Sequence, residues 1–208
     1  LDLEGMDARV DQVGQEPRQV EADRLLEGIV ALRPVRRGVA ALADRRIARH
    51  LAGFMAETDR FAKTIVFCVD QEHALEMRQA LAALNADLVK DHPDYVCRVT
   101  ADEGDIGSAH RAKFQDVETR TPVILTTSQL LTTGVDAPTC KNVVLTRIVG
   151  SMPEFKQIIG RGTRLRPDYG KLAFNIIDYT GTATRMFADP AFDGEPVREE
   201  ETVIDAEG

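Results

Sequence analysis

The sequence contains no tryptophan, only three cysteines among 208 residues, and no long hydrophobic run. Its longest apolar runs, 64–69 and 143–146, have the length of strands, far short of the roughly 20 residues that span a membrane. Cys68, Cys97 and Cys140 are widely spaced and form no C-x-x-C pair. A disulfide framework or a zinc site is therefore not expected. We expect reduced thiols in the core of a cytoplasmic protein.

Negative charge is concentrated at the two ends of the chain. The formal net charge is -8, which argues against bulk attraction to nucleic acid. Residues 1–30 carry a net -5 and residues 186–208 a net -7, which leaves +4 for the part between them. The most basic stretch, 141–171, has seven bases against two acids. We therefore expect any anion-binding site in this stretch, and solvated linkers at the acidic ends.

Strand-like and helix-like segments alternate after residue 39, and this pattern predicts the fold class. Strands that are apolar throughout and alternate with helices indicate an α/β protein with a mostly parallel sheet, covered on both faces. Asp70 and Ser151 are the expected helix caps, Ser151 in a capping box with Glu154. The expected strands are 64–69, 95–99, 122–126, 142–146 and 172–177. The expected helices are 39–58, 70–85, 108–117 and 151–163, with a helical turn at 128–131.

The same pattern divides the chain into three parts. Residues 1–40 show no convincing period and are expected to be an irregular lead-in. Residues 41–185 form the expected domain, and 186–208 the acidic linker that follows it. In parallel α/β folds, ligands bind beyond the carboxyl ends of the strands. The loops after residues 69, 99, 126 and 146 are therefore the first candidates for function.

The stretch Q-I-I-G-R-G-T-R, from Gln157 to Arg164, carries two arginines three residues apart. On a helix, Arg161 and Arg164 would share one face. Gly160 and Gly162 each cost about 1 kcal/mol in a helix interior, which suggests a close approach of the backbone to another group. Two planar guanidiniums that stay protonated suit a phosphoryl group. The alternative is a solvated basic helix end.

A second stretch, T-T-S-Q-L-L-T-T-G-V-D-A-P, directly follows the third expected strand. Hydroxyls and backbone amides at a strand end can hold a phosphate without bulk positive charge. Gly134 permits an unusual backbone conformation, and Asp136 can accept hydrogen bonds from ribose hydroxyls. The alternative is an ordinary polar loop with a turn.

Together and in this order, the two stretches resemble motifs V and VI of superfamily 2 helicases, and T-I-V-F-C at residues 64–68 resembles motif IV. The resemblance is closer still to the motor subunit of type I restriction enzymes, over roughly residues 60–194. It is carried by K-T-I-V-F-C-V-D-Q-E-H from residue 63, L-T-T-G-V-D-A-P-T-C-K-N from 131, F-K-Q-I-I-G-R-G-T-R-L-R from 155 and F-A-D-P-A-F-D-G from 187. It implies a RecA-like fold, the second of two such domains, with the first expected before Leu1.

The resemblance also implies roles for individual residues. Arg161 and Arg164 would be the arginine fingers that stabilise charge on the γ-phosphoryl group of ATP. Gln157 would sense the same phosphate. Gly134 and Asp136 would touch the nucleotide and couple it to DNA. The implied DNA-phosphate contacts are Thr127 and Ser128.

The sequence lacks the phosphate-binding motif G-x-x-x-x-G-K-[ST]. The acidic stretch 102–105 imitates a Walker B box, but Arg98 and Thr100 interrupt the strand before it, so we expect a polar loop. The resemblance places both elements in the first RecA-like domain, which would hold the Mg²⁺ of ATP. The fragment alone is therefore not expected to hydrolyse ATP or to cut DNA.

The implied function is that of the second motor domain of an ATP-dependent double-stranded DNA translocase in a type I restriction-modification endonuclease. The implied partners are double-stranded DNA, the first RecA-like and nuclease domains of the same chain, and the modification and specificity subunits; no membrane partner is expected.

Three alternatives remain beside this function. One is a domain of another superfamily 2 helicase, such as a type III restriction or repair motor, and another is a non-catalytic RecA-like interaction domain. The third is a nuclease site that would join Pro93-Asp94 to Glu154-x-Lys156. It is disfavoured because the two pairs lie sixty residues apart. The four histidines show no ligand spacing either.

Overall fold

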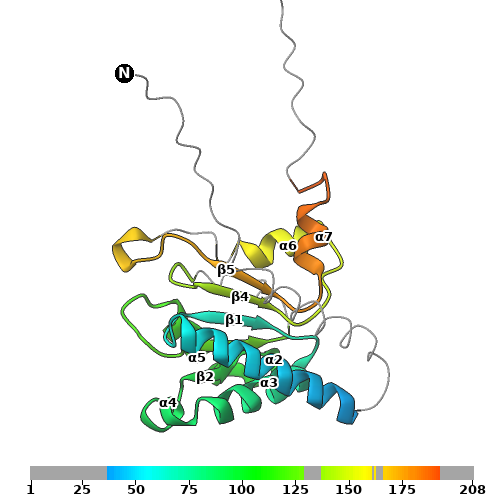
Figure 1. Cartoon of the computed structure of the whole chain (residues 1–208). Coiled ribbons are helices and arrows are strands. Elements are labelled where there is room, and N and C mark those ends of the chain that lie inside the picture. The colour runs from blue at the N-terminus through cyan, green and yellow to red at the C-terminus, as the bar shows by residue number, and fades with distance from the viewer. Residues whose placement is uncertain (1–36, 129–136, 161, 163–165, 193–208) are drawn as a thin grey trace, which may run out of the picture.

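The computed structural model describes residues 37–128, 137–160, 162 and 166–192, and their strands form one parallel sheet. The order across the sheet is β2-β3-β1-β4-β5, and every described pair of neighbours runs parallel. The strands are β1 (Thr64–Phe67), β2 (Val96–Arg98), β3 (Ile124–Thr127), β4 (Asn142–Leu145) and β5 (Asn175–Asp178). The α/β class with a parallel sheet is thus confirmed (Figure 1).

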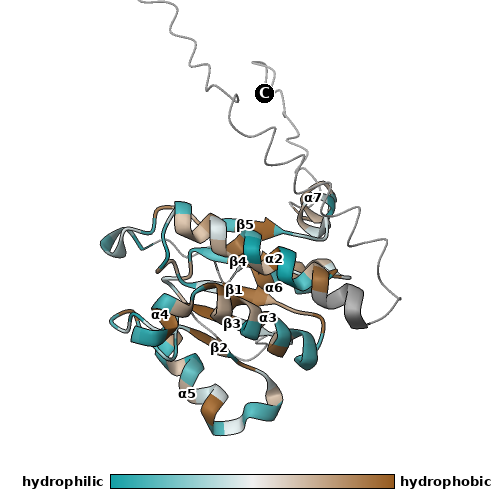
Figure 2. Ribbon diagram, turned by 60° about the horizontal axis from the view of Figure 1, so that its bottom comes forward, coloured by the Kyte–Doolittle hydropathy of each residue, from teal (hydrophilic) through white to brown (hydrophobic). Residues whose placement is uncertain are grey.

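Helices cover both faces of this sheet. The described helices are α2 (Arg37–Glu57), α3 (Gln71–Leu84), α4 (Ala86–Asp91), α5 (Gly104–Gln115), α6 (Met152–Ile159) and α7 (Thr182–Phe187). Two short 3₁₀ helices, η1 (Ala101–Glu103) and η2 (Pro167–Tyr169), complete the described elements. One apolar cluster packs α2 and α3 on the sheet, and a second packs α5, α6 and α7 on the opposite face. Figure 2 shows the apolar residues concentrated on the strands between these layers.

The central strand β1 explains why the strand sequences are apolar throughout. It pairs with β3 on one side and β4 on the other, and all four of its residues are buried. Ile65 and Phe67 point into one apolar cluster, whereas Val66 points into the other. A strand that is covered on both faces has no side for polar residues.

The bounds of two strands and one helix differ from the sequence prediction. The third strand begins at Ile124 rather than Pro122, since proline has no N–H for the ladder. Asn85 ends α3, where its side-chain amide donates to the carbonyl of Leu81, and α4 follows as a separate helix that the sequence pattern did not indicate. The fifth strand begins at Asn175, because Leu172 is 72% exposed and belongs to the turn before it.

Both predicted caps are confirmed, one of them in part. Asp70 accepts a hydrogen bond from the amide of His73, 2.8 Å away, at the start of α3. Ser151 accepts one from the amide of Glu154 at the start of α6. The capping box is not reciprocal in the described contacts, because the carboxylate of Glu154 pairs with Arg147 instead.

The acidic stretch 102–105 is helical, so the expected loop is wrong. It spans the end of η1 and the first turn of α5, which begins at Gly104 rather than at residue 108. Asp102 and Glu103 bind the guanidinium of Arg98, with N–O distances of 3.1 and 2.8 Å. These carboxylates therefore neutralise an arginine at the end of β2.

The sixth described helix, α7, was also not predicted.

Candidate functional site

The seven predicted site residues fall into two groups. Gln157, Thr127 and Ser128 belong to the described part of the chain. The other four, Arg161, Arg164, Gly134 and Asp136, lie outside the described residues. The described residues nearest to them in the chain are Gly160, Gly162 and Arg166 for the arginines and Ala137 for Asp136.

The described neighbours of the arginines lie at the edge where the strands begin. A Cβ added to Gly162 would meet the ring of Phe174, which precedes β5, at 2.3 Å. The carbonyl of Gly162 accepts a hydrogen bond from Lys171 Nζ, 2.8 Å away. Since α6 runs back across the sheet after β4, its carboxyl end returns to this edge. The close backbone approach that the glycines predicted is thus confirmed at Gly162.

The segment that follows the predicted nucleotide contacts meets the same edge. Pro138 comes two residues after Asp136 and precedes β4. Its carbonyl accepts a hydrogen bond from the same Lys171 Nζ, 3.1 Å away. The structure thus brings Pro138 and Gly162 together through one ammonium group. This edge differs from the carboxyl ends of the strands, where the loops were the first candidates for function.

Gln157 lies on the outer face of α6. Its neighbours Phe155 and Ile158 are fully buried against the sheet, whereas Gln157 is exposed. Apolar residues at this spacing fix the rotation of the helix. The Gln157 amide therefore faces away from the core, where a second domain or a ligand can reach it.

The two predicted hydroxyls lie at the opposite edge, where β3 ends. Thr127 is fully buried, and its carbonyl accepts a hydrogen bond from the amide of Cys68 on β1. Ser128 is partly exposed. In this conformation, Ser128 is thus the more accessible of the two, and a DNA contact at either residue stays a prediction.

Arginines near the ends of β2 and β4 are already paired with carboxylates. Arg98 binds Asp102 and Glu103, and Arg147 binds Glu154. Their side chains are only 15% exposed. Such internal pairing reduces the positive charge that these arginines offer to an outside anion.

The nuclease alternative is contradicted by geometry. Asp94 precedes β2 and pairs with Lys113, whereas Glu154 lies in the first turn of α6, after the carboxyl end of β4, and pairs with Arg147. The two carboxylates thus lie at opposite edges of the sheet. In the described part of the chain, no group of three or more His, Cys, Asp or Glu side chains gathers as a metal site would require.

The cysteines are buried and reduced, as predicted. Burial raises the pKa of each of the three thiols to about 12. Thiolates are the nucleophilic and metal-binding form, so these residues are structural.

Within the described ranges, no helix is both long and apolar enough to cross a membrane.

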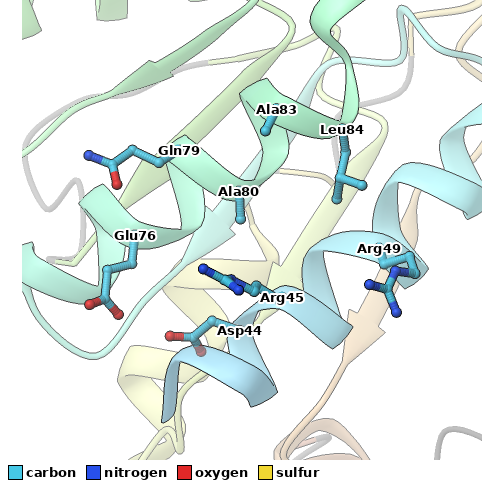
Figure 3. Close-up of a pocket in the computed structure, with 8 residues that line it drawn as sticks. All are labelled: Asp44, Arg45, Arg49, Glu76, Gln79, Ala80, Ala83 and Leu84. Atoms are coloured by element: carbon cyan, nitrogen blue, oxygen red, sulfur yellow. The ribbon is translucent and has the colours of Figure 1, made fainter. Parts of the chain in front are cut away.

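A surface hollow of about 480 Å³ lies between α2 and α3 (Figure 3). Its rim carries the charged residues Asp44, Arg45, Arg49 and Glu76. Burial and the neighbouring Asp44 carboxylate raise the pKa of Glu76. Of the predicted site residues that the structure describes, Gln157, Thr127 and Ser128, none lines this hollow.

Comparison with known proteins identifies the domain. The model of the family described as helicase conserved C-terminal domain matches residues 45–166. The endonuclease subunit of the type I restriction enzyme EcoAI from Escherichia coli is 50% identical over 150 residues, which cover 72% of this chain and 18% of that protein. The EcoKI endonuclease subunit from Escherichia coli K12 is 33% identical over 137 residues, 65% of this chain and 12% of that protein.

A solved structure shows the same fold. It is described as a fragment of an HsdR subunit of a type I restriction enzyme from Vibrio vulnificus YJ016, with a TM-score of 0.69 and 66% sequence identity. The match covers 80% of this chain and 33% of that one. The chain thus spans less than a fifth of the curated relatives it matches. The α/β fold is RecA-like, and the chain belongs to the helicase conserved C-terminal domain family, with close similarity to endonuclease subunits of type I restriction enzymes.

Proposed function

We propose that this chain is the second motor domain of an ATP-dependent double-stranded DNA translocase within a type I restriction enzyme. The observation that carries the proposal is the 50% identity to the EcoAI endonuclease subunit over 150 residues. These residues span most of the described domain. Another superfamily 2 motor and a non-catalytic interaction domain remain the alternatives that the experiment below must exclude.

The arrangement of the two edges supports this proposal. Gly162, next to Arg161 in the chain, lies where the strands begin, and Ser128 lies where β3 ends. A motor needs its nucleotide and DNA contacts on one rigid body but at separate places, so that a change at one moves the other. The parallel sheet between them is such a body, because its five strands are joined by continuous ladders.

In the proposed mechanism, ATP with Mg²⁺ binds mainly to the first RecA-like domain of the complete subunit. Closure of the cleft brings Arg161 and Arg164 to the γ-phosphoryl group, where they stabilise developing negative charge. Gln157, exposed on α6, would sense the same group. Gly134 and Asp136 would touch the nucleotide from the neighbouring segment. The chain by itself contains no P-loop, so we expect no ATP hydrolysis from it alone.

The test is the replacement of Arg161 or Arg164 by alanine in the complete subunit. An arginine finger acts mainly in the transition state, and its loss costs about 10³–10⁵ in rate. We therefore expect kcat for DNA-dependent ATP hydrolysis to fall by a factor in this range, while the Kd for ATP changes little.

Arg166→Ala is the matched control. This arginine belongs to the same stretch, but its guanidinium is held by Asp168, with an N–O distance of 2.6 Å. We expect near wild-type turnover from this variant. Near wild-type turnover by both the Arg161 and Arg164 variants would contradict the motor assignment and favour an interaction domain.

A further inference from the structure

Lys171 is among the largest fully buried side chains of the described residues, with 1% of its surface exposed. Its Nζ donates to two backbone carbonyls, those of Gly162 at 2.8 Å and Pro138 at 3.1 Å. Within the described ranges, it forms no ion pair with a carboxylate. Burial lowers the pKa of this lysine, as expected for an ammonium group removed from water.

A buried ammonium group is costly unless its hydrogen bonds serve a purpose. Removing a charge from water costs several kcal/mol, and carbonyl dipoles recover only part of it. An apolar side chain of similar length, such as methionine, would fill the same space without that cost. The position of Lys171 therefore suggests that the connection it makes matters more than its contribution to stability.

The connection joins three pieces of chain. The side chain reaches Gly162, which lies between Arg161 and Arg164, and Pro138, two residues after Asp136. The backbone of Lys171 pairs with that of Arg166 through two hydrogen bonds of 2.9 Å. One residue thus holds the chain on both sides of 163–165 and at the end of the segment that contains Asp136.

We propose that Lys171 is a positioning residue, which fixes the backbone at Gly162 and Pro138 in one register so that the arginines and Asp136 act on the same nucleotide. The inference rests on the proposed function, since it assumes that these residues meet ATP. Lys171 itself does not touch the nucleotide in this account. Its loss should therefore lower the rate of hydrolysis more than it weakens ATP binding.

Lys63 provides a matched control within the same domain. It is also buried, 6% exposed, and its Nζ donates to the carbonyls of Phe114 and Asp116 at 2.8 and 2.7 Å. Burial lowers the pKa of Lys63 as well. These carbonyls belong to the end of α5 and the residue after it, not to the segments next to the predicted nucleotide contacts. Lys63→Met therefore removes a comparable buried ammonium from a different connection.

The experiment compares Lys171→Met, Lys63→Met and the double variant Arg161→Ala/Arg164→Ala in the complete subunit. Hydrogen exchange is followed at the amides of Cys140 and Gly162, which are bonded to Ala137 and Ile159. ATP affinity and kcat are measured on the same samples. For Lys171→Met we expect about tenfold faster exchange at both amides and at least a tenfold lower kcat, with less than a threefold change in Kd for ATP. Lys63→Met should show none of these changes.

The contrary results separate a failure of this inference from a failure of the proposed function. An equal loss of kcat in Lys63→Met and Lys171→Met would mean general destabilisation and would overturn the inference, as would faster exchange in Lys171→Met with unchanged kcat. If Lys171→Met does not fold, Lys171→Gln keeps an amide NH₂ without the charge and on a shorter side chain, and it should show the same separation of kcat from Kd. Full activity of the double arginine variant would refute the proposed function itself, whatever the lysine variants do.

Discussion

Gly162 shows at the scale of one residue how the chain brings a predicted site close to the sheet. Its missing side chain lets the backbone lie against the ring of Phe174, where a Cβ would approach to 2.3 Å. An added methyl group must therefore displace the ring or the backbone. The sequence indicated this contact, because two glycines in a helix-like stretch are costly unless something approaches closely.

We predict that Gly162→Ala destabilises the domain by about 1–3 kcal/mol, the usual cost of forcing extra atoms into a packed site. Gly150→Ala is the control, since a Cβ there meets nothing within 4 Å. Thermal or denaturant unfolding of the two variants measures the difference. Equal stability of both variants would show that the ring of Phe174 yields without cost.

The burial of Lys171 is a feature that the sequence did not predict. Lys171 was counted only as one of seven bases in the stretch 141–171, since no pattern separates a buried lysine from an exposed one. Its ammonium group is bonded to the carbonyls of Gly162 and Pro138, which the fold brings together. The buried cysteines were predicted correctly, because an apolar environment is the common state of an unpaired thiol.

At the scale of elements, α6 carries Gln157 and leads into Gly162 at the edge where the strands begin. Ser151 begins it beyond the carboxyl end of β4, and the apolar residues Phe155, Ile158 and Ile159 hold it on the sheet. The sequence predicted this helix and its cap, but it placed the end at residue 163 rather than at Ile159 and did not indicate that the far end returns to the opposite edge. The period of a helix indicates which face is buried, whereas its direction across the sheet follows from the topology.

The cap of α3 allows a prediction at this scale. Asp70→Ala removes the oxygen that accepts from the amide of His73, at 2.8 Å, and should cost about 1 kcal/mol of unfolding free energy. Asp70→Asn keeps an acceptor and should recover most of that loss. Denaturant unfolding of both variants provides the comparison. An asparagine variant as unstable as the alanine variant would indicate that the charge, not the cap, is what matters.

At the scale of the whole molecule, the fold class and layer arrangement were predictable because they follow from patterns repeated over many residues. The strand and helix alternation survives errors of a few residues at each boundary. The candidate site was less predictable, because the crossovers bring Gly162 and Pro138 to one edge of the sheet and Ser128 to the other. The two stretches that the sequence singled out contain Ser128, Pro138 and Gly162, but no sequence pattern indicates that Pro138 and Gly162 meet through Lys171.

The distribution of charge predicts how the complete subunit binds DNA. Arg98 and Arg147, near the ends of their strands, are already paired with carboxylates, so these two arginines are not free to displace counterions. We expect the affinity for DNA of unrelated sequences to fall with salt, but with a shallow slope. Ser128→Ala should weaken binding more than Thr127→Ala, because Thr127 is fully buried.

A salt series with DNA of several sequences measures both effects. A strong sequence preference by the subunit alone would contradict contact through phosphates, which repeat identically along the duplex. Unchanged binding in the Thr127→Ala/Ser128→Ala double variant would place the contact elsewhere on the domain.

The central claim is that this domain helps to move double-stranded DNA by completing an ATP site. The most direct measurement is displacement of a third DNA strand, bound at increasing distances along a linear duplex, by the complete subunit with ATP. We expect a lag that grows with distance for the wild type, and no displacement by Arg161→Ala/Arg164→Ala although the variant still binds ATP. Displacement by that variant at the wild-type rate, or a wild-type lag independent of distance, would contradict the account.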